Sequence, residues 1–136
     1  MIMLNHITPI PDLLKEATEI QAFLDITCSE EIAEIIDRGN RLSAIISRTV
    51  KMRADSEYHR DALMQSEIMR LVAQMSKAGT LPASTVNKLI HSACKDANYL
   101  VTITDRLNRT ATHQLDFVRS LISYEKEQLR LKETGY

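Results

Sequence analysis

The stretch from Ala83 to Thr134 contains neither glycine nor proline, and this absence constrains the fold more than any other feature. The 136-residue chain has only three glycines and three prolines, about 4% of its residues against a typical ~12%. A β-sandwich or a β-barrel needs many turns, and turns draw heavily on these two residue types. We therefore expect a single all-α domain.

The positions of these few residues predict where the helices begin and end. Pro9 and Pro11 hold the start of the chain extended, so residues 1–10 are expected to form an irregular strap. Gly79 and Pro82 bracket one turn, because glycine caps the end of a helix and proline suits the first turn of the next. The sequence thus predicts a short helix followed by a long antiparallel helical hairpin.

The predicted helices span residues 11–26, 30–77 and 83–131. We expect the short helix to fold back on 30–45 and 115–131, which would make that end a three-helix, coiled-coil-like bundle. Two alternatives stay open. The polar stretch 51–61 could form a loop, and the threonine-rich stretch 104–112 could carry a kink.

Apolar residues recur at steps of three and four in each predicted helix, which is the pattern of one buried face. The stripe of the short helix consists of Leu13, Ala17, Ile20 and Leu24. The stripe of the last helix runs through Val86, Ile90, Ala93, Ala97, Leu100, Thr104, Leu107, Ala111, Gln114 and Val118. Gly39 lies within the stripe of the middle helix, where it would let a neighbouring helix approach closely.

Near the turn, only two helices are present to cover their apolar stripes, and two helices bury such stripes poorly. We expect a partner to cover them, with a homodimer favoured over another helical protein. The predicted oligomer or partner seam consists of Met64, Ile68, Leu71, Met75, Val86 and Ile90. A methionine-rich surface can also serve as an adaptable peptide-binding face, and this alternative stays open.

Charge is unevenly distributed, although the formal net charge is only −1. Residues 1–37 carry eight acidic side chains and one lysine, whereas residues 38–53 carry five basic side chains and no acidic one. These bases could form an anion-binding or nucleic-acid-binding patch, because phosphate contacts need only clustered cations. The candidate patch consists of Arg38, Arg41, Arg48, Lys51, Arg53, Arg106 and Arg109.

The same cations could instead be neutralised within the molecule. Glu34–Arg38 and Asp37–Arg41 have the i,i+4 spacing of helix ion pairs, with the acid in the preferred N-terminal position. Asp105 and other acidic residues are expected close to the remaining cations. We favour a layer of interleaved ion pairs that sets the register between helices.

Nothing in the sequence predicts catalysis, and we expect the protein not to be an enzyme. His59 has Asp55 four residues before it, but the hairpin brings no second such pair beside it, so no metal site is predicted. Cys94 has His91 nearby without a third group or an oxyanion donor. With only isolated glycines, no phosphate-binding loop is present, and no cofactor is expected.

The cellular setting is expected to be the cytoplasm, without membrane association. The start of the chain lacks the basic region and apolar run of a signal peptide, and no transmembrane segment is evident. Two cysteines at an uninformative spacing suit a reducing compartment. The favoured function is a non-enzymatic interaction protein, such as an adaptor, scaffold or small regulatory subunit. The alternative is a nucleic-acid-associated accessory protein.

Overall fold

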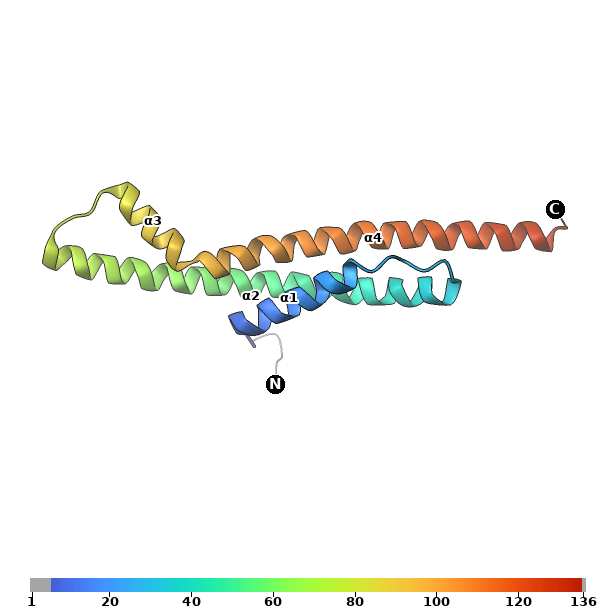
Figure 1. Cartoon of the computed structure of the whole chain (residues 1–136), viewed down its shortest axis with the longest axis horizontal. Coiled ribbons are helices and arrows are strands. Elements are labelled where there is room, and N and C mark those ends of the chain that lie inside the picture. The colour runs from blue at the N-terminus through green and yellow to red at the C-terminus, as the bar shows by residue number, and fades with distance from the viewer. Residues whose placement is uncertain (1–5, 136) are drawn as a thin grey trace.

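The computed structural model of the chain describes residues 6–135, and within that range every regular element is an α-helix. The helices are α1 (Ile10–Leu24), α2 (Ile32–Ala78), α3 (Ala83–Ala93) and α4 (Lys95–Glu133). The all-α prediction is confirmed. The molecule is elongated, with α2 and α4 side by side along its length and α1 lying across their middle (Figure 1).

The predicted boundaries of α1 and α2 lie close to those observed. All four residues of the predicted stripe of α1 are buried, and they join the core of the molecule. Helix α2 runs without a break through 51–61, so the alternative of a loop there is wrong. Gly79 ends α2 with a φ of 95°, and its N–H bonds to the carbonyl of Met75 at 3.0 Å.

The third predicted helix, 83–131, is divided in two at Cys94. This residue has φ −98° and ψ 10°, outside the helical range, and its thiol is buried beside α2 near the carbonyl of Arg60. The division lets α3 turn away from α2 while Cys94 stays packed against it (Figure 1). The break therefore lies where α3 leaves α2 while Cys94 remains packed against it. No glycine or proline marks this point.

The threonine-rich stretch 104–112 is continuous helix, so α4 is not interrupted there. Thr104 is fully buried, and its hydroxyl donates to the carbonyl of Leu100 at 2.7 Å within the same helix. A hydroxyl satisfied in this way removes the cost of burying a polar group, so the helix continues.

Helix α1 lies nearer the middle of the hairpin than the sequence predicts. Leu24, at its end, accepts a hydrogen bond from Gln114 through its carbonyl oxygen, and Glu16, in its first half, pairs with Arg48. The segment 25–31 runs on from Leu24 to reach the start of α2, which displaces α1 by that length along the hairpin. The last turns of α4 extend past the start of α2 (Figure 1).

The core between α2 and α4 follows the predicted stripes. Six of the stripe positions in α4 are buried: Ala97, Leu100, Thr104, Leu107, Ala111 and Val118. A Cβ added at Gly39 would lie 3.2 Å from a methyl group of Val118. This contact confirms the close approach predicted at Gly39, because even a Cβ would come closer to Val118 than ordinary van der Waals contact allows.

Candidate interaction surface

Arg38, the first cation of the predicted basic patch, is buried and faces the interior. Its guanidinium donates to the side-chain oxygen of Gln114 at 2.6 Å and lies 4.8 Å from the centre of the Phe23 ring. The predicted pair with Glu34 is not among the ion pairs of the described residues. Arg38 instead fixes α4 and α1 to the start of α2, through a hydrogen bond and a cation–π contact.

The other predicted helix pair is confirmed, because Arg41 and Asp37 lie 3.2 Å apart. Both side chains are exposed, and such pairs contribute little to stability. Arg106 is also exposed, and it takes part in none of the ion pairs found within residues 6–135. Arg41, Arg106 and Arg109 are therefore exposed members of the predicted patch.

Asp105 joins the two long helices at the polar middle of the hairpin. Its carboxylate lies 2.8 Å from Arg53 of α2 and 3.2 Å from Arg109 of its own helix. Arg53 also pairs with Glu57 at 3.0 Å. Each of these cations thus faces at least one carboxylate, as the interpretation of interleaved ion pairs requires.

A second polar cluster, which the sequence did not reveal, holds the N-terminal strap on α2. The N–H of Thr8 donates to Asp55 Oδ2 at 3.1 Å, and the carbonyl of Thr8 lies 2.7 Å from His59 Nε2. Arg48 donates to the Thr8 hydroxyl at 3.2 Å. We call this cluster of Thr8, Arg48, Lys51, Asp55 and His59 the strap clasp.

Two ion pairs reinforce the strap clasp. Lys51 Nζ lies 2.5 Å from Asp55 and 2.7 Å from the carbonyl of His6, and Arg48 holds Glu16 of α1 through two bonds of 2.6 and 2.8 Å. Burial alone would raise the pKa of Asp55, but the bonds from Lys51 and Thr8 outweigh burial and lower this pKa. The clasp therefore stabilises the charged carboxylate in a buried position.

The sequence contained a signal for the α2 side of the strap clasp, but none for its pairing with the strap. Residues 51–61 interrupt the apolar stripe of α2, and His59 follows Asp55 by one helical turn. The structure shows that this polar stretch is one side of a docking site whose other side is the strap. Of that strap, residues 1–5 lie outside the described range, whereas Ile10 packs against the core.

The predicted seam residues divide into buried and exposed groups. Leu71 is buried, and the structure leaves Met75, Val86 and Ile90 half-buried near the turn. Met64 and Ile68 are 36% and 43% exposed. With Met69 and Val72 they form an apolar area on the last third of α2, which we call the tip surface: Met64, Ile68, Met69 and Val72.

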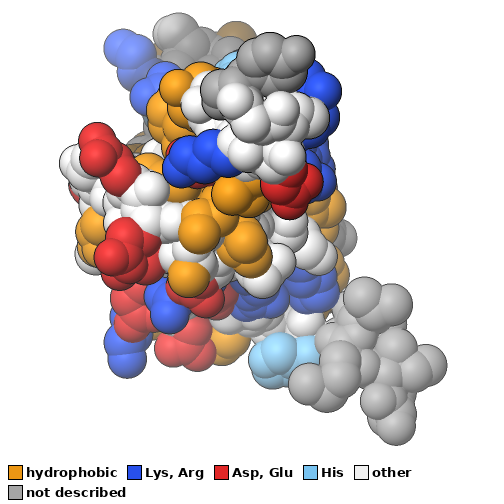
Figure 2. Space-filling view, turned by 90° about the vertical axis from the view of Figure 1, so that its right-hand side faces the viewer, with side chains coloured by type: hydrophobic (Ala, Val, Ile, Leu, Met, Phe, Trp, Pro, Cys, Tyr) orange, Lys and Arg blue, Asp and Glu red, His pale blue; other side chains and the backbone are white. Residues whose placement is uncertain are grey.

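A second apolar area lies at the opposite end of the molecule. The segment 25–31 and α4 enclose a groove of about 550 Å³, which we call the end groove; its apolar lining consists of Cys28, Ile35, Phe117, Leu121 and Tyr124. Phe117 and Tyr124 are 58% and 60% exposed. Seen from this end, apolar side chains gather in the middle of the face and charged ones lie around them (Figure 2).

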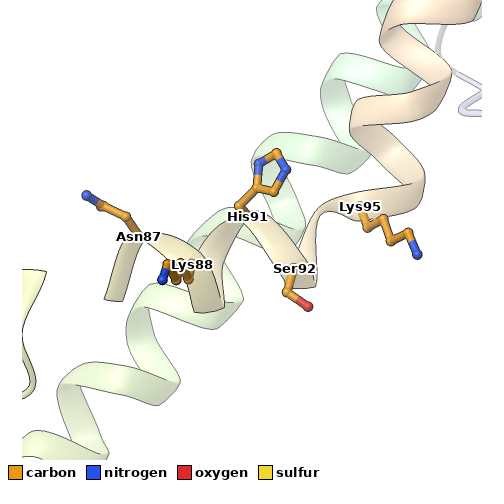
Figure 3. A pocket seen from close by; sticks show the side chains of 5 residues that line it. All are labelled: Asn87, Lys88, His91, Ser92 and Lys95. Carbon is orange, nitrogen blue, oxygen red and sulfur yellow. The ribbon is translucent and has the colours of Figure 1, made fainter. Parts of the chain in front are cut away.

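A cavity of about 500 Å³ lies along α3, lined by Asn87, Lys88, His91, Ser92 and Lys95. These side chains spread to different sides of the helix and do not converge on one point (Figure 3). Among residues 6–135, no three His, Cys, Asp or Glu side chains are grouped closely enough to hold a metal ion. The polar groups there therefore form an open polar surface.

Within the described part of the chain, none of the helices combines the length and apolar character needed to cross a bilayer. Comparisons with protein-family models, with curated proteins and with solved structures found no match for this chain.

Proposed function

We propose that the protein is a non-enzymatic helical interaction protein, an adaptor, scaffold or small regulatory subunit, that assembles as a homodimer. The tip surface is the observation that carries this proposal. Met64, Ile68 and Val72 follow one another at steps of four along α2, and Met69 lies beside Val72. Together they form a continuous apolar strip on the surface of a long helix.

Such a strip favours association, because each square ångström of apolar surface removed from water contributes about 25 cal/mol. At the tip only α2 and α3 are present, and α3 buries none of its residues. A helix from another chain is the usual way to complete such a pair.

The nucleic-acid alternative has less support. Five of the seven cations of the predicted patch form an ion pair with a carboxylate: Arg41, Arg48, Lys51, Arg53 and Arg109. Binding a phosphate backbone would require these pairs to separate, or would depend on the few cations that lack a carboxylate.

Light scattering on the purified protein tests the proposal. At micromolar concentration we expect a mass about twice 15.5 kDa, as expected for two chains. The double variant Ile68→Glu/Val72→Glu should shift the mass towards that of one chain, because it places two carboxylates in the apolar strip.

The matched control is Ser66→Glu/Gln74→Glu, which adds the same charge to exposed polar positions of the same helix outside the strip. It should leave the mass unchanged, and circular dichroism should show the same helicity for both variants. A wild-type protein that stays monomeric throughout the micromolar range would contradict the proposed homodimer.

A further inference from the structure

The tip of the molecule carries only positive charge. Between Ile68 and Lys95 the chain has no aspartate or glutamate, but it has four basic side chains, Arg70, Lys77, Lys88 and Lys95. This range includes the end of α2, the turn and the whole of α3. Among these cations, Arg70 is held by Glu67 at 2.6 Å.

The opposite end carries unpaired negative charge. The acidic residues of the segment 25–31 and of the first turns of α2 lie there, far from the tip (Figure 1). Charged side chains without an ion-pair partner in the described range occur at both ends. They are Lys77, Lys88 and Lys95 at the tip, and Glu30, Glu31, Glu34 and Glu125 at the other end, with Lys126, Lys132 and Glu133 further along α4.

The end groove combines this negative charge with an apolar floor. Glu30 and Glu125 line the groove of about 550 Å³ together with its apolar side chains. A ligand that fits it should present apolar groups flanked by cations, as an amphipathic basic helix does. Electrostatic complementarity of this kind selects partners and orients them.

Helix α3 has the features that this groove requires. It spans 11 residues and buries none of them, and it has no acidic residue. Val86 and Ile90 form an apolar pair at a step of four, whereas Lys88, two positions from each, lies on the opposite side of the helix. Figure 3 shows Lys88 and His91 projecting from α3.

We propose that the end groove of one copy binds α3 and the adjoining tip of a second copy, in an antiparallel two-fold dimer. Tip and groove lie at opposite ends of the molecule, and α3 turns away from α2 on the side of α4, which also lines the groove (Figure 1). An antiparallel pair therefore makes the contact twice and leaves no unfilled groove. This inference rests on the homodimer of the proposed function and specifies its two surfaces.

Reversal of charge at each surface tests the arrangement. The tip variant is Lys88→Glu/Lys95→Glu, and the groove variant is Glu30→Lys/Glu34→Lys. Each variant alone should dissociate about tenfold more readily than the wild type, because like charges then face each other in both contacts. An equimolar mixture of the two should regain the wild-type mass, because each tip then meets a groove of opposite charge.

The control Lys15→Glu reverses one exposed charge on α1, away from both surfaces, and should leave dimerisation unchanged. If the wild type is a dimer and neither variant affects its mass, the tip-in-groove contact is wrong, although the proposed homodimer stands. If the wild type is a monomer, the homodimer itself is wrong. A mass that grows beyond two chains would overturn the two-fold arrangement, because it indicates open head-to-tail association.

Alkylation of Cys28 offers an independent readout, since this half-buried thiol lines the end groove. Its alkylation should slow as the concentration of wild-type protein rises through the dimerisation range. The groove variant should show no such protection. Cys94, which is buried, provides an internal reference in the same mass spectra. Concentration-independent alkylation of Cys28 in a dimeric protein would contradict an occupied groove.

Discussion

Asp55 has the most unusual environment of any charged residue described in this protein. Its side chain is almost completely buried, yet it sits on a helix whose apolar stripe is interrupted at that point. A buried carboxylate is tolerated only when donors surround it, and here Lys51 and the Thr8 N–H supply them. The strap is therefore part of what makes this polar stretch of α2 stable.

Replacing Asp55 with asparagine should measure what the charge of this side chain contributes to stability, separately from its size. The variant Asp55→Asn keeps the size of the side chain but loses the ion pair with Lys51, so the free energy of unfolding should fall by about 1–3 kcal/mol. Hydrogen exchange at the Thr8 amide should become faster in the same variant. The control Asp37→Asn removes the exposed pair with Arg41 and should change stability by about 0.5 kcal/mol or less. Equal effects of the two variants would contradict the role given to Asp55.

The lowered pKa of Asp55 predicts how stability depends on pH. A carboxyl group that is more acidic in the folded state stabilises the fold above its ordinary pKa of 3.8, and that contribution is lost as the pH falls through the folded value. The difference in unfolding free energy between wild type and Asp55→Asn should therefore be constant near neutral pH and shrink below about pH 4. Urea unfolding at a series of pH values measures this difference. A gap that widens in acid would show the opposite sign of the shift.

At the scale of the helices, the contact between α2 and α4 is close at Gly39. A Cβ there would lie 3.2 Å from Val118, which is buried and has little room to move. Glycine costs a helix about 1 kcal/mol relative to alanine. At Gly39 this cost is offset by the close packing that glycine permits.

A double-mutant cycle at Gly39 and Val118 should measure the energetic coupling between these two positions. In the wild type, Gly39→Ala gains helix propensity but crowds Val118, so the two effects oppose each other. In a Val118→Ala background the crowding is relieved, and Gly39→Ala should then stabilise the protein by about 1 kcal/mol. Chemical denaturation of the four proteins gives the coupling energy. Strict additivity would mean that the two positions do not share a tight contact.

The long helices could be predicted because their buried positions recur regularly. Leu13, Leu100 and Leu107 follow from the period alone, and all three are buried. The break at Cys94 could not be predicted in this way, since no glycine or proline marks it. Its cause is the position of α3 relative to α2, which is a tertiary contact and not a local preference.

The charged sites follow the same division between local and distant contacts. The pair Asp37–Arg41 is local and was predictable from spacing, whereas Arg38 bonds to the distant Gln114 instead of its neighbour Glu34. The strap clasp joins residues 40 to 51 positions apart, and single-sequence periodicity contains no such information.

For the molecule as a whole, stability should vary along the long axis. Three helices pack together in the middle, but only α2 and α3 meet at the tip, where α3 buries no residue. Local opening requires less free energy where fewer apolar groups are buried. In native-state hydrogen exchange, we expect amides of α2 near Met52 to be protected longer than those near Met69. Uniform protection along α2 would contradict this gradient.

The position of α1 has a consequence for the order in which the chain can fold during synthesis. Its last residue, Leu24, is held by Gln114, which is 90 positions later in the sequence. At about 5–20 residues per second, the ribosome needs several seconds to make that intervening length. The apolar stripe of α1 therefore lacks its native contacts with α4 throughout that time, which leaves it open to binding by a chaperone during translation.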